Sequence, residues 1–167
     1  MTGLSQPTED DTPMLWLPIA AAIASISVVG IAIGLGMPLL SIILELRGYS
    51  ASMIGLNTAI AGIASIFAAP LATPLAVRFG VVWTMLAMIL LGAASFVGFY
   101  FAPAFWMWFP LRVTLHLSLT ILFILSEFWI STSAPAHKRG LVLGIYATVL
   151  SLGFAAGPWP FAQMGSS

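Results

Sequence analysis

Three ionisable side chains, Arg112, His116 and Glu127, stand within one long apolar stretch of this 167-residue chain. Ionisable groups inside a membrane are costly and are by default candidates for function. Arg112 and His116 are four residues apart, and Glu127 follows His116 by eleven. At roughly 100° of rotation per residue, these spacings predict that the three side chains share one helix face. We expect that face to look into a helix bundle or a water-filled cavity.

Each of these residues suggests a particular chemistry. Arg112 carries a permanent charge, so it can bind an anionic solute group or a partner carboxylate, unless it simply extends to the outer interface. His116 can carry a proton near neutral pH or can hydrogen-bond a neighbour. Glu127 fits a gate or a structural ion pair near the inner end, with proton carriage as the alternative. Asn57, a polar residue in an earlier apolar stretch, is a further candidate to line a solute path.

The composition identifies the solvent around these residues. Hydrophobic residues make up 60% of the chain and charged residues 6%, whereas about a quarter of a soluble domain is charged. Five basic and five acidic side chains cannot cover a soluble globule of this length. The apolar surface must therefore face lipid, and the bilayer is the first expected partner. The net charge of zero gives no indication of a nucleic-acid partner.

Five apolar stretches are long enough to cross a bilayer, which needs about 20 residues per helix. The predicted spans are 14–44, 52–77, 81–101, 105–132 and 140–164. Unbroken apolar runs without alternation favour helices over a barrel. The predicted fold is thus an all-α membrane bundle over 14–164, with a tail at 1–13 and part of an outer loop at 165–167. Pro38 is expected to kink the first span.

The few basic residues predict an orientation. With the N-terminus inside, Arg78, Lys138 and Arg139 lie in inner loops, while Arg47 lies in an outer loop. This distribution agrees with the tendency of basic residues to stay on the cytoplasmic side. We therefore expect a multi-pass protein of the cell membrane with a cytoplasmic N-terminal tail, and a bacterial inner membrane as its location.

Glycines at four-residue spacing mark surfaces for close helix packing. Gly30 and Gly34 form such a pair in the first span, and Gly153 and Gly157 form another in the fifth, followed by Pro158. Small residues allow membrane helices to approach closely. The pairs predict either ordinary close packing or surfaces along which helices rock.

Sequence motifs of common enzymes are missing. The chain has no His-Glu-x-x-His, no Gly-x-Ser-x-Gly, no phosphate-binding glycine loop and no cysteine. We therefore expect a protein that is not an enzyme and that has no catalytic residues, cofactor or metal ion.

The turn at 73–80 has a distinctive pattern of residues. Leu75, Ala76, Arg78 and Gly80 match the motif Gly-x-Leu-Ala-Asp-Arg-x-Gly-Arg-Arg. The turn thereby resembles the inner loop between helices two and three of the major facilitator superfamily. Val77 replaces the aspartate of that motif, so the inner-gate salt bridge of the family cannot form in its usual way. We expect Glu127 to substitute by pairing with Arg78.

Further motifs in the same order along the chain resemble this family. The run at 34–50 is similar to the end of its first helix and its first outer loop. Arg112 matches the fourth-helix arginine of its proton-linked exporters. The run Gly-Phe-Ala-Ala-Gly-Pro at 153–158 resembles the helix-five motif of its antiporters, although Phe161 and Ala162 replace the closing glycines. The helix-four end around Glu127 looks like that of an efflux-like branch.

The resemblance implies a function as well as a fold. Transporters of the family that this chain resembles have twelve helices in two six-helix halves. The resemblance implies that the five spans are part of the amino-terminal half. The whole protein would move a small organic solute by alternating access, as a proton-coupled exporter, together with a C-terminal half. Its inner gate would comprise Arg78, Gly80, Glu127, Lys138 and Arg139. The alternative is a membrane protein without transport activity that assembles with partner helices.

Overall fold

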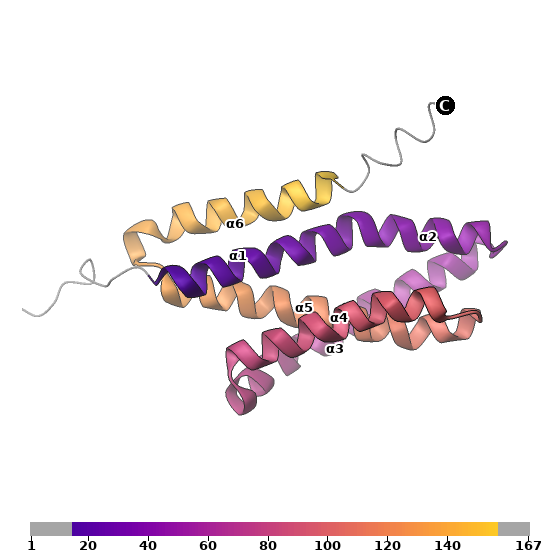
Figure 1. Ribbon diagram of the computed structural model, residues 1–167, viewed down its shortest axis with the longest axis horizontal. Helices are drawn as coiled ribbons and strands as arrows, with labels where there is room; N and C mark the ends of the chain where they lie inside the picture. The colour runs from indigo at the N-terminus through magenta and orange to yellow at the C-terminus, as the bar shows by residue number, and fades with distance from the viewer. Residues whose placement is uncertain (1–14, 157–167) are drawn as a thin grey trace, which may run out of the picture.

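The computed structural model describes residues 15–156, and every element in this range is helical (Figure 1). The elements are α1 Trp16–Ile31, η2 Ala32–Gly36, α2 Met37–Leu46, α3 Ala51–Phe79, α4 Val81–Phe101, η3 Phe105–Met107, α5 Trp108–Ser133 and α6 Ala136–Ala156. The predicted tail at 1–13, the predicted loop at 165–167 and the residues Gly157 and Pro158 lie outside the described range.

Five helical segments in the described range are long and apolar enough to cross a membrane. The first comprises α1, η2 and α2, the fourth comprises η3 and α5, and the other three are α3, α4 and α6. This result confirms the all-α fold with five membrane spans. Successive spans are joined by short connections, so consecutive spans run in opposite directions.

The first span contains a π-helical turn, η2, which ends two residues before Pro38. Proline has no N–H to donate to the carbonyl four residues earlier, and its ring also collides with that carbonyl. Gly34, the residue at this position, lies within the π turn. A widened turn accommodates the lost bond, and such turns are common where a helix bends.

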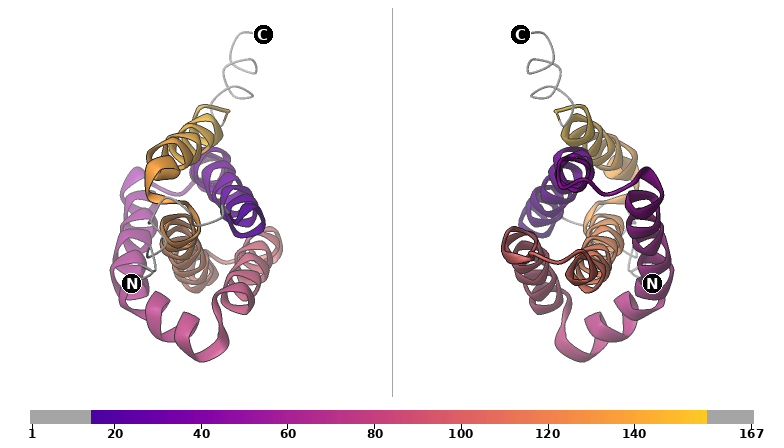
Figure 2. Two further views of the ribbon diagram at one scale, coloured as in Figure 1. Left: turned by 90° about the vertical axis from the view of Figure 1, so that its left-hand side faces the viewer. Right: turned by 90° about the vertical axis from the view of Figure 1, so that its right-hand side faces the viewer.

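Helix α5 lies near the centre of the bundle, with α1, α3 and α4 around it, whereas α6 packs on the outside of α1 (Figure 2). The buried core follows this arrangement. Its fully buried members on α5 include Leu115, Ile121 and Leu122, which have 0–1% of their surface exposed. The central position of α5 explains why side chains on this helix lie deepest inside the protein.

Helix α6 begins at Ala136, four residues before the start of the predicted span. The amides of Lys138 and Arg139 donate to the carbonyl of Pro135 at 3.0 and 2.9 Å. These basic residues thus lie in the first helical turn instead of a loop. Both are exposed, because a first turn at the membrane edge leaves charged side chains in water.

The glycines of α1, η2 and α6 bring two helix backbones into direct contact. A Cβ atom built on Gly153 would lie 2.8 Å from the carbonyl carbon of Gly30. One built on Gly34 would lie 2.5 Å from the carbonyl oxygen of Gly153. No side chain fits between the helices at these points, so glycine is required there for steric reasons.

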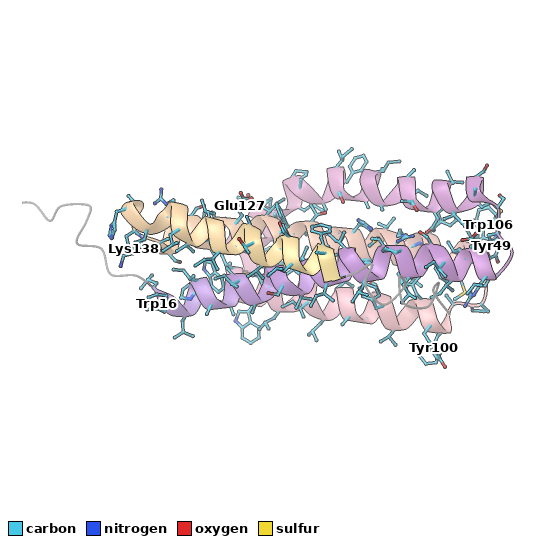
Figure 3. All side chains as sticks on the ribbon, turned by 90° about the horizontal axis from the view of Figure 1, so that it is seen from above. Trp16, Tyr49, Tyr100, Trp106, Glu127 and Lys138 are labelled. Carbon is cyan, nitrogen blue, oxygen red and sulfur yellow. The ribbon has the colours of Figure 1, made fainter. Side chains whose placement is uncertain are left out.

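Arg47, which lies between α2 and α3, joins the elements at one end of the bundle. Its Nη1 donates to the carbonyl oxygen of Ala102 at 2.8 Å, and its guanidinium lies 5.2 Å from the ring centroid of Trp108. Figure 3 shows Tyr49, Tyr100 and Trp106 at this end, and Trp16 and Lys138 at the opposite end. Aromatic residues at both ends are typical of helices that end at membrane interfaces.

Candidate functional site

Arg112 of α5 lies in the interior of the bundle with 1% of its surface exposed. Its Nε donates to Asn57 Oδ1 of α3 at 2.9 Å, and its Nη1 lies 3.0 Å from Met37 Sδ of α2. Asn57 is itself fully buried. Three spans therefore meet at one guanidinium, and Arg112 does not extend to the outer interface.

The hydrogen-bonding capacity of this cluster is only partly used. Arg112 Nη2, Asn57 Nδ2 and His116 Nε2 are buried atoms without a hydrogen-bond partner. The acidic residues in the described range are Glu45 and Glu127, and both are exposed. Within that range, no carboxylate is bonded to Arg112. The positive charge of Arg112 and the N–H groups of Arg112 Nη2 and Asn57 Nδ2 therefore have no partner. Such unpaired groups are costly in a low-dielectric interior.

His116 lies one helical turn beyond Arg112 and is half-buried. It lines a pocket of about 150 Å³ between α1, η2, α3 and α5, together with Ser65 and Thr120. Thr120 donates to Ser65 at 3.0 Å. The structure therefore places His116 between two polar contacts that join α3 to α5.

Glu127 lies in a different environment from Arg112. The two are fifteen residues apart, so their directions around the helix differ by roughly 60°. Arg112 is buried, His116 is half-buried and Glu127 is exposed. The predicted shared face therefore turns from the interior of the bundle toward the outside along α5.

The predicted gate residues lie near one end of the bundle without the expected pair. Arg78 is exposed, and its guanidinium lies 5.4 Å from the ring centroid of Phe79. Although the structure describes both Arg78 and Glu127, it contains no ion pair between them. Gly80 turns the chain between α3 and α4 with a φ of +84°, a conformation that other residues rarely adopt.

Met37, Ser65 and Thr120 are site residues that the sequence analysis missed. A signal for two of them was present, because Ser65 follows Asn57 by eight residues and Thr120 follows Arg112 by eight. Residues eight apart differ by roughly 80° in direction around a helix, which still falls within one stripe about 100° wide. Met37 gave no such signal, since methionine in an apolar span is indistinguishable from ordinary core.

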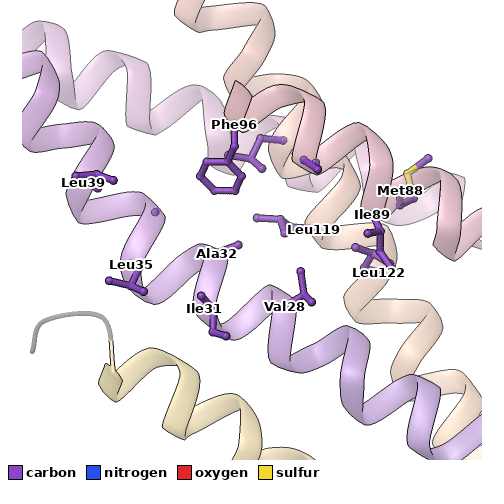
Figure 4. Close-up of a pocket in the computed structure, with 14 residues that line it drawn as sticks. Val28, Ile31, Ala32, Leu35, Leu39, Met88, Ile89, Phe96, Leu119 and Leu122 are labelled. Carbon is purple, nitrogen blue, oxygen red and sulfur yellow. The ribbon is translucent and has the colours of Figure 1, made fainter. Parts of the chain in front are cut away.

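A second hollow has a different chemical character. A groove of about 420 Å³ lies between α1, α2, α4 and α5, and Phe96, Leu119 and Val28 are among its lining residues (Figure 4). Only glycines and apolar side chains line it. This groove therefore offers no side-chain hydrogen bond to a charged solute. The candidate site is instead the group of polar residues Arg112, Asn57 and His116. Among the described residues, no group of three or more histidines and carboxylates could hold a metal ion.

Comparisons of the sequence with known proteins identify the family of the chain. A sequence profile of the Major Facilitator Superfamily matches residues 21–163. The MFS-type transporter YfkF of Bacillus subtilis (strain 168) is 30% identical over 148 residues, which are 85% of this chain and 37% of the relative. The chain thus spans little more than a third of that relative's length. Multi-pass membrane insertion and the profile match together show that this chain belongs to the major facilitator superfamily.

Proposed function

We propose that this chain is part of a secondary active transporter that moves a small organic solute by alternating access. The observation that supports this most is the buried Arg112, which has no carboxylate partner among the described residues. Burying a charge in this way costs stability, and proteins accept such a cost mainly at functional sites. The site lies where α2, α3 and α5 meet, so small movements of these helices would change its access.

The transporter acts together with helices beyond the five described. The 37% coverage of the relative supports this proposal, as do the largely unburied faces of α3 and α6. A C-terminal half would form the opposite wall of the solute path. Transport is then a rocking of the two halves around the solute, with Arg112, His116 and Asn57 at the binding or coupling site.

We propose that the transporter exports its solute and that coupling to protons supplies the energy. Their support is the position of Arg112 and the partial helix-five motif at 153–158. The test is solute flux in proteoliposomes containing the full-length protein under an imposed pH gradient. Flux that reverses when the gradient reverses is the expected result, whereas flux independent of the gradient would reject proton coupling.

The inner gate is proposed to form from Arg78, Gly80, Glu127, Lys138 and Arg139 in another state of the cycle. The described conformation leaves Arg78 and Glu127 exposed, so both are free to pair when the inner end closes. A double-mutant cycle with Arg78→Gln and Glu127→Gln in the full-length protein measures their coupling in transport. Additive effects of the two substitutions would reject the gate pair.

We also propose that the N-terminus is cytoplasmic and that the protein resides in a bacterial inner membrane. The supporting observation is that Lys138 and Arg139 begin α6 at one end, while Arg47 lies at the other. The chain has no cysteine, so single cysteines introduced at 47 and 138 report sidedness cleanly. A membrane-impermeant thiol reagent should label position 47 in intact cells and position 138 only after permeabilisation.

Assembly with partner helices, without transport, is the alternative function. Gly30, Gly34 and Gly153 are already in contact with one another inside the chain. Gly140 and Gly144 of α6 have open space around them, as do Gly55 and Gly62 of α3, so these glycines are available for such a role. A full-length protein that moves no solute but copurifies with a second membrane protein would favour this function.

A further inference from the structure

Two prolines one helical turn apart, Pro70 and Pro74, lie inside α3 near its end. Proline has no N–H to donate, so the helical bonds to the carbonyls of Ile66 and of Pro70 itself are both missing. Sharp bends in long helices are usually found at proline. The stretch 70–74 is therefore the part of α3 that bends most easily.

The packed face of α3 ends within this stretch. The buried residues of the helix recur every three or four positions and form one face, which packs against α5: Asn57, Ala61, Ala64, Ala68 and Ala72. After the last of these, no residue in the remainder of α3 is buried. We call the final five residues, 75–79, the α3 tip. The bundle thus holds α3 tightly before the prolines and not after them.

The neighbouring helix α4 holds the α3 tip only weakly. The Thr84 hydroxyl lies 3.2 Å from the carbonyl of Leu75 and 2.8 Å from that of Gly80. A hydroxyl has one hydrogen, so its bond to the tip is shared with a closer acceptor. A hollow of about 350 Å³ also separates Leu75 and Phe79 from Trp83 on α4. The tip therefore has room to move against α4.

Hydrogen-bonded pairs define which residues of α3 and α5 lie at the same level. Asn57 meets Arg112 at 2.9 Å, and Ser65 meets Thr120 at 3.0 Å. Both pairs are 55 residues apart in sequence. Because this separation is constant, the two helices run in the same direction and rise together along the bundle. A separation of 55 residues can therefore be used to align the rest of α3 with α5.

This alignment shows two exposed surfaces at the same level beyond the prolines. It places Ala72, the last buried residue of α3, level with Glu127 of α5, and Val77 level with Thr132. Val77 is 82% exposed and Phe128 is 52% exposed, and Glu127 and Thr132 are exposed as well. Figures 1 and 2 show the turn between α3 and α4 set apart from the nearby end of α5. The two helices are thus packed together up to position 72 and open beyond it.

We propose that the α3 tip is a hinged segment that bends at Pro70 and Pro74 and closes against residues 127–132 of α5. The described conformation is the open one. Closure covers the exposed apolar side chains of the tip and of Phe128, and it carries Arg78 toward Glu127. This inference rests on the transport function proposed above and supplies the movement that its inner gate requires.

Pairs of spin labels measure this movement directly. The chain has no cysteine, so labels are attached to cysteines introduced into the full-length protein, after replacement of any cysteine elsewhere. The tip pair is 77 and 132, and the reference pair is 58 and 113, which has the same separation of 55 residues before the prolines. Thr58 and Val113 are exposed. In lipid nanodiscs, the tip pair should show two separations and the reference pair one. A single separation for the tip pair would overturn the proposal.

Replacing the prolines tests the cause of the movement. Pro70→Ala combined with Pro74→Ala restores two N–H groups, so the tip pair should then show one separation. Amide exchange over 66–74 should slow about fivefold or more, as expected for an added helical hydrogen bond. The matched control is Pro110→Ala in the first turn of α5, where an N–H has no helical acceptor; it should leave both separations in place. An unchanged reference pair reports that each variant is folded, and two remaining separations in the double variant would reject the hinge.

Failure of this inference is distinguishable from failure of the transport function. If the full-length protein moves solute in proteoliposomes while the tip pair has one separation, transport stands and the hinge is rejected. If the tip pair has two separations that the proline substitutions abolish, but no solute crosses under any gradient, the hinge stands and transport is rejected.

Discussion

Replacing Gly153 by alanine should push α6 away from α1. A Cβ atom at this position would lie 2.8 and 2.9 Å from two backbone atoms of Gly30 and 3.1 Å from the amide nitrogen of Ile31. Ordinary van der Waals contact begins at 3.4 Å, so the helices must separate by about 0.6 Å, the difference between 3.4 and 2.8 Å. All three atoms belong to the backbone and cannot turn aside as a side chain would.

The cost of this separation follows from the loss of close packing. Association of membrane helices depends on van der Waals contact between small residues, and overpacking typically costs about 1–3 kcal/mol. Alanine also favours the helix by about 1 kcal/mol relative to glycine. The matched control Gly144→Ala on the same helix has nothing within 4 Å, so it receives this gain without the clash. The two variants should therefore differ by about 1–3 kcal/mol.

The assay is reversible unfolding of the purified chain in mixed micelles, followed by circular dichroism as the fraction of denaturing detergent rises. Gly144→Ala should equal or exceed the parent protein in stability, and Gly153→Ala should fall below Gly144→Ala. Gly34→Ala should lose at least as much as Gly153→Ala, because its Cβ would approach a backbone oxygen to 2.5 Å. Equal stability of the Gly153 and Gly144 variants would refute the packing explanation.

Three further predictions concern other contacts. Pro38→Ala restores an N–H and should convert η2 to regular helix, seen as slower amide exchange over 32–36, and unchanged exchange would exclude proline as the cause. Arg47→Gln removes the contact with Trp108 and should lower the stability by about 0.5–1 kcal/mol in thermal unfolding, whereas no change would show that the contact contributes nothing. The Ser126 and Tyr146 hydroxyls are 3.1 Å apart, so Ser126→Ala and Tyr146→Phe should show a coupling of about 0.6 kcal/mol in a double-mutant cycle, and additivity would contradict it.

The sequence was sufficient to predict the class of fold. The surplus of apolar residues identifies lipid as the solvent, because that property depends on composition and not on which residues touch. The lengths of the apolar runs then give five spans. The bounds of α6 were less predictable, since charged residues such as Lys138 suggest a loop although they also fit the first turn of a helix at the membrane edge.

The candidate site was only half predictable. Helical periodicity placed Arg112 and His116 on one face because that relation is local. It could not identify Asn57 as the partner of Arg112, since the two are 55 residues apart. Helical periodicity also did not show that Arg112 is buried whereas Glu127 is exposed. That difference depends on where the neighbouring helices end.

What the sequence by itself determined is therefore the solvent, the spans and the order of family motifs, all of which follow from composition or from residues close in the chain. The tertiary structure decided that Arg112 is buried without a carboxylate partner among the described residues, and that a pocket adjoins His116. These features depend on the rotation and register of α3 against α5. That geometry is set by the packing of the whole bundle, so it cannot be obtained from either helix alone.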